Sequence, residues 1–474
     1  MVRDDQNYLD RIVVFDKIRI SKPVIADRRI SSIIRIFHGK SEESFKLIFS
    51  YREKVAMDQN MAGLILTMPV INFSYFSRKL ELDFPVTEID LNYIRNVMTI
   101  NNREVFINAI CRRRYNFYKP VAIPSEDEIT ESNANGITEI IATQLIPDTQ
   151  KTQHINVNTG DKRKTAVLSS GGKESLLTYS ILKEIGMDVH PIFFNESGAH
   201  WRAAKPSFES FSSNNRNTTK VWSNADRFYR FCINLLPFLN HPLIRKRTDT
   251  YPVQMFTFPV YVFSILPILI KRSILFVFMG NEFDDPSDMP SYHGLSHYSG
   301  IYDQTLDFTN SISQYIKGKG YDISLSSILY PVTATIVERM LVRRYHDIFL
   351  LQRSCHSCSI VQNRVIPCGK CSKCLGVIML ILAAGGKPEE VGYTESSIDL
   401  AKRSSGSLRL DTDEIKYLYS GSAEDSHVTG IHVLPDEREP LSHIASGIRE
   451  KVLSIFREYC KGQYYYRKSR WVQS

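Results

Sequence analysis

The chain has 474 residues, of which 43% are hydrophobic and 23% are charged. This composition is close to the globular average and excludes a disordered or fibrous protein. The length corresponds to two or three domains of about 150 residues. Lys and Arg outnumber Asp and Glu by 59 to 51, a net charge of +8. Such a mild excess suits anionic substrates such as nucleotides, and it equally fits an ordinary basic surface.

Several features predict a cytoplasmic protein that does not enter a membrane. The first residues show no basic start followed by an apolar region, so we expect no signal peptide. The most apolar stretch, 255–270, has 16 residues and contains Pro259 and Pro267. A membrane span needs about 20 apolar residues, so a buried helix is favoured. Five of the eight cysteines lie within 355–374, which indicates a reduced compartment and a metal site rather than disulfides.

The N-terminal part predicts a small α+β domain over residues 1–123. Short β-like runs occupy 11–20 and 45–51, and helical spacing follows at 57–67 and 90–112. From residue 124 to 163 the chain becomes polar, with clusters of Ser, Asn, Thr and Gln. This composition predicts a linker over 124–163.

After the linker, strands alternate with helices. We predict strands at 165–169, 189–194 and 273–279, and helices at 174–186 and 252–270. Strands that are apolar throughout and alternate with helices predict an α/β domain, a parallel sheet with helices on both faces, over 164–385. Residues 386–474 form a C-terminal extension. We expect its basic, aromatic end, 461–471, to be an exposed and frayed terminus rather than a nucleic-acid contact.

A glycine loop is the sharpest motif, and it consists of Ser169, Ser170, Gly171, Gly172, Lys173, Glu174 and Ser175. Two glycines let a backbone turn tightly and approach a phosphate, and the following helix directs free N–H groups toward that phosphate. Ser170 and Ser175 add hydroxyl donors, and Lys173 adds a mobile positive charge. A Walker loop does not fit, because Val167 stands where that motif needs glycine and Glu174 where it needs Ser or Thr.

Five cysteines make up the second motif: Cys355, Cys358, Cys368, Cys371 and Cys374. Four thiolates with CxxC spacing complete a closed tetrahedral zinc site that stabilises a fold. Cys368, Cys371 and Cys374 supply three ligands, and either Cys355 or Cys358 supplies the fourth. An iron–sulfur cluster is the competing interpretation, because it also takes four cysteines. We predict structural zinc.

The loop resembles Ser-Gly-Gly-x-Asp-Ser, the pyrophosphate loop of the PP-loop (N-type) ATP pyrophosphatases, with Glu174 where that family usually has Asp. The loop followed by the cysteines is similar to 7-cyano-7-deazaguanine synthases. The layout over residues 10–385 is similar to the ATP-dependent epimerases that act on UDP-muramoyl-alanyl-glutamate. The resemblance implies the adenine nucleotide alpha hydrolase-like fold and the cofactors ATP, Mg²⁺ and Zn²⁺.

This resemblance implies an enzyme that adenylates the carboxylate of a small-molecule or peptide-like substrate and releases AMP and pyrophosphate. We predict that Lys173, Glu174 and Glu282 are catalytic, with both glutamates contacting Mg²⁺, and that Asn281 joins the loop in binding ATP. Glu282 and Asn281 follow a strand end, where open α/β sheets bind ligands. The alternatives are a tRNA sulfurtransferase of the same class, which would need nucleic acid as partner, and a non-catalytic nucleotide- and zinc-binding module. Weaker candidates for substrate contact are Asn195, Glu196, His293, His297, Tyr302, Asp303 and Gln304.

Overall fold

The computed structural model describes residues 7–112, 116–148, 163–196, 198–245, 251–253, 255–283, 290–355, 357–404, 406, 408, 410–420, 427–433, 446–467 and 470–473. The chain divides into two compact units, which are described separately. Unit 1 comprises Met1–Val157, Val221–Arg272 and Asp288–Asp322, and unit 2 comprises Asn158–Lys220, Ser273–Ser287 and Ile323–Ser474.

This division differs from the domains expected from the sequence, because unit 1 takes up two segments of the predicted 164–385 domain. Residues 221–223 pair with strand β4 (Ser41–Tyr51) of the N-terminal region, and helix α9 (Phe258–Arg272) packs on helix α2 (Gln59–Thr67). Residues 386–474 lie in unit 2 instead of forming a separate extension. Tertiary pairing between distant segments sets these boundaries.

Unit 1 contains a mixed sheet with the strand order β9-β4-β3-β1-β5-β6, in which β2 pairs with β3. The strands are β1 (Lys17–Ile20), β2 (Val24–Ala26), β3 (Arg29–His38), β4 (Ser41–Tyr51), β5 (Lys79–Val86), β6 (Glu139–Leu145) and β9 (Thr219–Ser223), of which residues 221–223 belong to unit 1. β3 and β4 form a long antiparallel hairpin that turns at Gly39, where φ is +57°. The predicted β-like run at 11–20 is only partly a strand, because Asn7 caps the short helix α1 (Tyr8–Ile12).

Helices of unit 1 pack on this sheet and on one another. The α-helices are α1, α2 and α9, given above, with α3 (Glu88–Glu104), α4 (Glu131–Asn135), α7 (Ala225–Asn234), α8 (His241–Arg245) and α10 (Leu306–Gly318). The 3-10 helices are η1 (Val70–Phe76), η3 (Pro120–Ala122), η4 (Glu126–Glu128) and η6 (Tyr302–Gln304), and η2 (Val105–Cys111) is a π-helix. β11 (Ser291–Tyr292) and β12 (Leu295–Ser296) form a small hairpin. A capping box of Thr87 and Asp90 starts α3. Within the described ranges, no helix has both the length and the apolar character needed to cross a membrane.

The predicted linker at 124–163 contains secondary structure over its first part. η4, α4 and β6 lie between residues 126 and 145, and β6 pairs in parallel with β5. The Thr138 hydroxyl donates to the carbonyls of Ser74 and Ser77. The polar clusters at 124–128 and 132–136 thus fall in and around η4 and α4, two short helical segments, which explains why the composition suggested a linker. Residues 149–162 lie outside the described residues.

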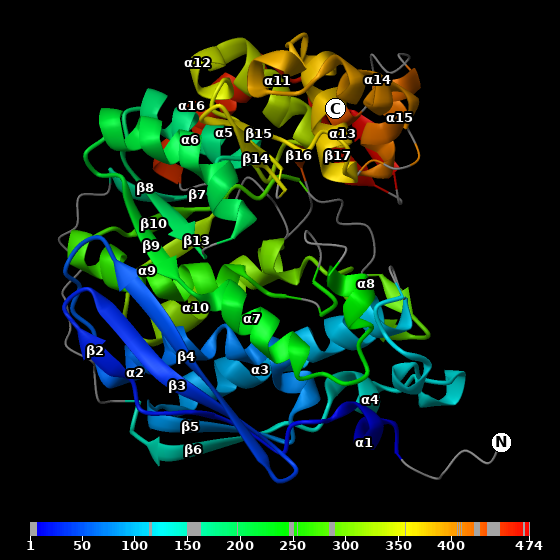
Figure 1. Ribbon diagram of the computed structural model, residues 1–474. Coiled ribbons are helices and arrows are strands. Elements are labelled where there is room, and N and C mark those ends of the chain that lie inside the picture. The colour runs from blue at the N-terminus through cyan, green and yellow to red at the C-terminus, as the bar shows by residue number, and fades with distance from the viewer. Residues whose placement is uncertain are drawn as a thin grey trace. The chain divides into compact units, whose positions relative to one another are not determined.

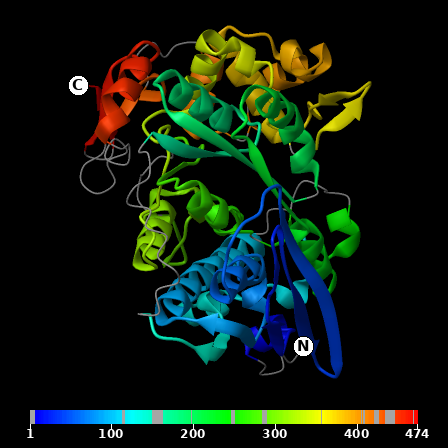
Figure 2. The same ribbon diagram turned by 90° about the vertical axis from the view of Figure 1, so that its left-hand side faces the viewer.

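Unit 2 is built on four parallel strands in the order β13-β10-β7-β8. They are β7 (Lys164–Ser169), β8 (Asp188–Asn195), β10 (Phe276–Phe278) and β13 (Ser324–Ser326). The predicted strands are therefore present and parallel, and the α/β class is confirmed. Because all four strands run the same way, their carboxyl ends share one edge of the sheet (Figures 1 and 2).

One apolar core joins the helices of unit 2. α5 (Lys173–Glu184) packs on β7 and α11 (Ala334–Arg344), α11 packs on α13 (Ser372–Ala384), and α6 (Ala199–Asn214) packs on β8. The remaining elements of unit 2 are α12 (His346–Phe349), β14 (Ser359–Val361), β15 (Arg364–Ile366), η7 (Pro388–Val391), α14 (Glu395–Arg403), α15 (Thr412–Ser420), η9 (His427–Thr429), β16 (Ile431–Val433), α16 (Ser446–Arg457), β17 (Gln463–Arg467) and β18 (Arg470–Gln473).

The expectation of a frayed C-terminal end is wrong for its described residues. β17 pairs with both β16 and β18 to form a three-stranded sheet. The Tyr464 side chain is buried, and the Trp471 ring stacks on His427 and meets the edge of Phe283. Trp471, which the sequence placed in an exposed tail, therefore packs against Phe283 in the segment that follows β10.

Candidate functional site

The glycine loop lies at the carboxyl end of β7, where α5 begins. β7 ends at Ser169 and α5 starts at Lys173, so the loop joins strand to helix as predicted. The Ser175 hydroxyl accepts a hydrogen bond from the Ser170 N–H at 3.2 Å and lies 3.2 Å from the Gly172 carbonyl, to which it donates. The Ser170 hydroxyl accepts from the Gly172 N–H at 3.3 Å. The two serines thus hold the loop in its shape.

Two glycines allow close backbone approaches beside this loop. Gly171 has φ of +78°, and a Cβ there would lie 2.8 Å from the Ser207 hydroxyl and 3.1 Å from the Ala203 carbonyl of α6. Gly280 follows β10, and a Cβ there would lie 2.7 Å from the Glu174 Cβ and 2.9 Å from the Ser175 nitrogen. Gly171 therefore serves helix packing as well as the turn. Gly280, to which we assigned no role from the sequence, lets the first turn of α5 pack against the end of β10.

Lys173 connects two carboxylates that are far apart in sequence. Its ammonium lies 2.5 Å from Glu174 Oε1 and 2.6 Å from Glu282 Oε2. Only 4% of the Lys173 side chain is exposed, against 28% for Glu174 and 29% for Glu282. The structure thus brings the three predicted catalytic residues together. It also corrects the expected mobility of Lys173, because two ion pairs and burial fix the ammonium.

The pKa values in this cluster reflect burial and mutual charge. Burial alone would lower the pKa of Lys173, but the charges of Glu174 and Glu282 raise it above its ordinary value. Burial favours the protonated form of Glu174, yet Lys173 lowers the net pKa of that carboxyl. For Glu282, desolvation by the surrounding protein outweighs the attraction of Lys173 and raises the pKa to about 7. One carboxyl is therefore firmly ionised, and the other titrates near neutrality.

Two further carboxylates lie in the same electrostatic environment, and we did not identify them from the sequence. Glu338 on α11 is fully buried, and its Oε2 accepts from the Gln352 side chain at 3.0 Å. Burial raises the pKa of Glu338 to about 8. Glu414 on α15 accepts from the Thr335 N–H and hydroxyl at 2.8 and 2.9 Å, and burial raises its pKa as well. The one available signal was a charged residue within the apolar face of a helix.

Asn281 is positioned by buried contacts at the end of the same strand. Its side-chain amide donates to the Tyr330 hydroxyl at 3.3 Å, and its carbonyl accepts from the Ser327 hydroxyl at 2.5 Å. These contacts hold the turn between Gly280 and Glu282. Asn281 therefore supports the position of Glu282, while its predicted contact with ATP stays a prediction.

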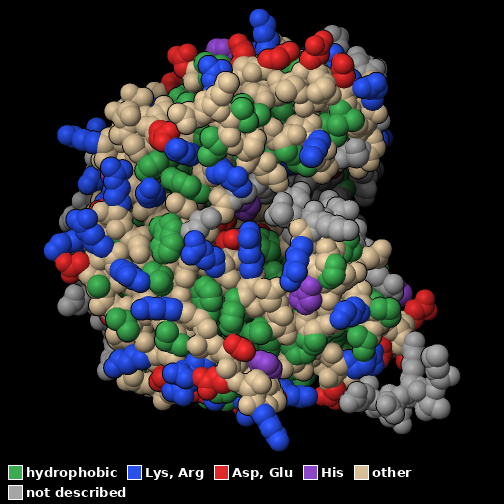
Figure 3. All heavy atoms as spheres, viewed as in Figure 1, with side chains coloured by type: hydrophobic (Ala, Val, Ile, Leu, Met, Phe, Trp, Pro, Cys, Tyr) green, Lys and Arg blue, Asp and Glu red, His purple; other side chains and the backbone are tan. Residues whose placement is uncertain are grey.

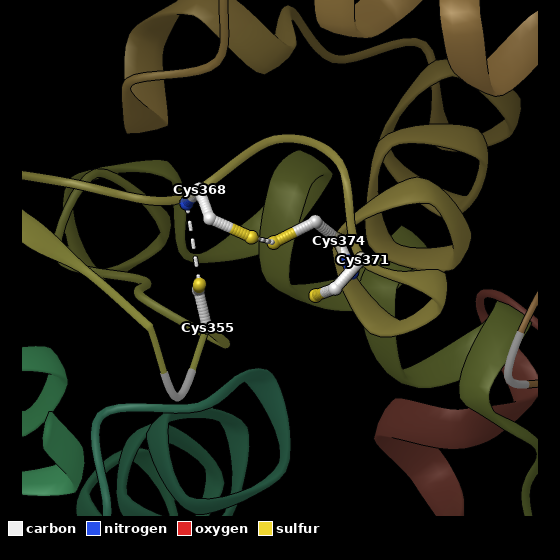
Figure 4. Close-up of side chains that lie close together, drawn as sticks. All are labelled: Cys355, Cys368, Cys371 and Cys374. Atoms are coloured by element: carbon white, nitrogen blue, oxygen red, sulfur yellow. Dashed lines mark hydrogen bonds between the residues drawn. The ribbon is translucent and has the colours of Figure 1, made fainter. Parts of the chain in front are cut away.

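The cysteines form a compact cluster of sulfur atoms (Figure 4). The ligand atoms of Cys355, Cys368, Cys371 and Cys374 all lie within 4.8 Å of one another. Cys371 caps α13, and its sulfur accepts from the Cys374 N–H. The Cys355 sulfur accepts from the N–H groups of Ser357 and Cys368. Four close sulfurs with backbone N–H···S bonds can hold a metal ion such as zinc.

The structure distinguishes the two candidates for the fourth ligand. Cys358 is not part of the group of four sulfurs, and its thiol donates to the Cys355 carbonyl at 3.1 Å. Cys355 completes the group instead. The predicted set of five is thus reduced to four candidate ligands, with Cys358 as a buried neighbour that holds the knuckle.

Most of the weaker candidates have structural roles. In unit 2, Glu196 pairs with His200 at 2.7 Å. In unit 1, Asp303 is buried and accepts from the N–H groups of Thr257 and Phe258, which places it at the start of α9. His297 and Tyr302 are also buried. These residues thus pack within unit 1, and their contact with a substrate stays a prediction.

Basic side chains are spread over much of the face drawn in Figure 3, and acidic side chains lie among them. No protein-family model matches the chain, and no curated protein matches it. The resemblance to PP-loop enzymes therefore rests on the motifs themselves.

Proposed function

We propose that this chain is a PP-loop ATP pyrophosphatase that binds Mg²⁺-ATP at the glycine loop and adenylates a substrate carboxylate. The observation that carries the proposal is the meeting of the loop, Lys173, Glu174 and Glu282 within unit 2. A strand end, a glycine turn and a helix N-terminus together form an arrangement that suits phosphate. The 7-cyano-7-deazaguanine synthases and the glutamyl epimerases serve here only as models for the class of substrate.

The chemistry of the site fits an anionic nucleotide that carries a hard cation. The first N–H groups of α5 have no partner inside the helix, and its positive dipole end favours the terminal phosphates. Glu174 and Glu282 supply the carboxylate oxygens that would hold Mg²⁺. When bound, the ion would neutralise charge on the phosphates of the leaving group. Lys173 keeps the two carboxylates close together.

Adenylation explains how such a site activates a carboxylate. A substrate carboxylate oxygen attacks the α-phosphorus, the bond to the β-phosphate oxygen breaks, and pyrophosphate leaves while held by the loop. N–H groups that point at the leaving group stabilise the charge that develops there. The resulting acyl-adenylate then reacts onward to an amide, a nitrile, a thiolated product or an epimer. The cysteine cluster, with four protein ligands, fits a structural metal rather than a catalytic one.

The test follows the label of α-labelled ATP. The protein is incubated with this nucleotide, Mg²⁺ and panels of carboxylate substrates, and the nucleotides are separated. We expect labelled AMP in equal amount to pyrophosphate, and Glu282→Gln should reduce it. Labelled ADP without AMP would falsify the adenylation mechanism. ATP binding without turnover on any substrate would favour the non-catalytic binding module.

A further inference from the structure

Ser354 lies beside the glycine loop, although it follows the loop's first residue, Ser169, by 185 positions in the sequence. The Arg353 N–H donates to the Gly171 carbonyl at 2.9 Å, which ties this segment to the loop backbone. The Ser354 hydroxyl lies 3.8 Å from the position that a Cβ on Gly172 would take. Because Gly172 has no side chain, no side chain at that position lies between the Ser354 hydroxyl and the loop backbone.

The Ser354 hydroxyl is buried and unsatisfied. Ser354 is 7% exposed, and no described group forms a hydrogen bond with its hydroxyl oxygen. Buried hydroxyls nearly always have a partner, and leaving one without a partner destabilises a fold. The other two hydroxyls at the loop, those of Ser170 and Ser175, are already engaged with loop backbone. Ser354 therefore offers an unused donor next to the loop.

The neighbouring residue fixes where this donor stands. Cys355 follows Ser354 directly and contributes one of the four clustered sulfurs. Its sulfur accepts from the Cys368 N–H at 3.2 Å, which links the segment to the knuckle before α13. A metal bound by the four sulfurs would hold Cys355 still. The position of Ser354 would then depend on the metal.

We propose that the Ser354 hydroxyl binds the terminal phosphates of the nucleotide, and that the metal centre positions it through Cys355. This inference rests on the proposed binding of ATP at the glycine loop and adds a donor from a different part of the chain. It also couples two sites. Phosphate binding strengthens metal retention, and metal binding strengthens phosphate binding by the same factor.

The first experiment titrates the metal-loaded chain with inorganic pyrophosphate and Mg²⁺ in a calorimeter. Ser354→Ala should weaken pyrophosphate binding about tenfold, which corresponds to about 1.4 kcal/mol. The same variant should not lower the melting temperature of the ligand-free protein, because the lost hydroxyl has no partner there. Ser357→Ala is the matched control, since it lies in the same knuckle and should bind pyrophosphate as the parent chain does.

The second experiment measures the rate at which a colorimetric chelator removes zinc. Saturating pyrophosphate should slow zinc loss several-fold in the parent chain and in Ser357→Ala, but not in Ser354→Ala. Equal pyrophosphate affinity in the parent and Ser354→Ala would overturn the role of Ser354 and leave the proposed function intact. A parent chain that binds neither pyrophosphate nor ATP would overturn both. Zinc loss that pyrophosphate does not affect would overturn the coupling.

Discussion

Glu338 offers a direct test of the electrostatics beside the glycine loop. This carboxyl is fully buried in α11, and burial raises its pKa to about 8 from an ordinary value of 4.5. In the unfolded chain it ionises near pH 4.5, whereas in the fold it keeps its proton to about pH 8. The folded state therefore binds more protons between these values, so Glu338 makes the fold less stable as pH rises through this window.

The magnitude follows from the two pKa values. At about 1.4 kcal/mol for each pH unit, the full difference corresponds to roughly 5 kcal/mol above pH 8. Relaxation of buried charged sites makes about 2 to 5 kcal/mol a realistic range. Glu338→Gln removes this cost and keeps an oxygen that can accept from Gln352. We expect the variant to match the parent at pH 4.5 and to exceed its unfolding free energy by that amount at pH 9.

The assay is calorimetric unfolding of both proteins at half-unit steps from pH 4.5 to 9. The difference in unfolding free energy between variant and parent is taken at each pH, because the contributions of the other titrating groups then cancel. Glu389→Gln is the control, because Glu389 is exposed in η7 and its substitution should leave the pH dependence unchanged. A constant difference across the whole pH range would show that Glu338 does not carry a raised pKa.

Three further sets of substitutions test the metal site, the packing of the loop and a candidate cation ligand. We expect one equivalent of zinc to co-purify with the chain, to be lost in Cys355→Ser and Cys371→Ser, and to be retained in Cys358→Ser. Elemental analysis measures the zinc content, and equal loss in all three variants would contradict the set of four sulfurs. Gly280→Ala should lower the free energy of unfolding by about 1 to 3 kcal/mol, because the new Cβ would lie 2.9 Å from the Ser175 backbone nitrogen. Denaturant titration measures this change, and Gly406→Ala, where a Cβ would meet open space, should show none. Glu282→Gln should slow AMP formation more than it weakens ATP binding. In the parent chain, Mg²⁺-dependent ATP binding should become stronger as pH rises through about 7, where Glu282 ionises, and the substitution should remove this rise. A pH profile of binding that the substitution leaves unchanged would argue against Glu282 as a Mg²⁺ ligand.

The parallel strands and the glycine loop could be predicted because their signals are local. The apolar run before Ser169 and the two glycines before Lys173 specify a strand, a turn and a helix without help from distant residues. The linker prediction was wrong over 126–145 for a related reason. The polar clusters of this stretch lie in and around η4 and α4, whereas β6 is a partly exposed edge strand that its pairing with β5 places in the sheet.

The rest of the candidate site depends on contacts that no local pattern encodes. The Glu338–Gln352 and Glu414–Thr335 hydrogen bonds join residues that are far apart in the sequence. The burial and the hydrogen bonding of each carboxyl therefore become visible only in the folded chain. The same holds for Ser354, which is an ordinary serine in sequence and an unsatisfied donor in the fold. The placement of residues 221–223 in unit 1 likewise agrees with their pairing with β4, which no local pattern encodes.

The charges around Lys173 limit what can bind beside the glycine loop. Lys173 contacts Glu174 and Glu282 directly, and Glu338 and Glu414 add to the negative potential when ionised. Burial raises the pKa of three of these four carboxyls, which reduces but does not remove the excess of negative charge. A bare polyphosphate would be repelled by such a cluster. If ATP binds here as proposed, it must therefore arrive with its magnesium ion, whose two positive charges offset both the phosphates and the glutamates. The replacement of the usual Asp by Glu174 is compatible with this requirement, because the ionised carboxylate is retained and Lys173 holds it in place.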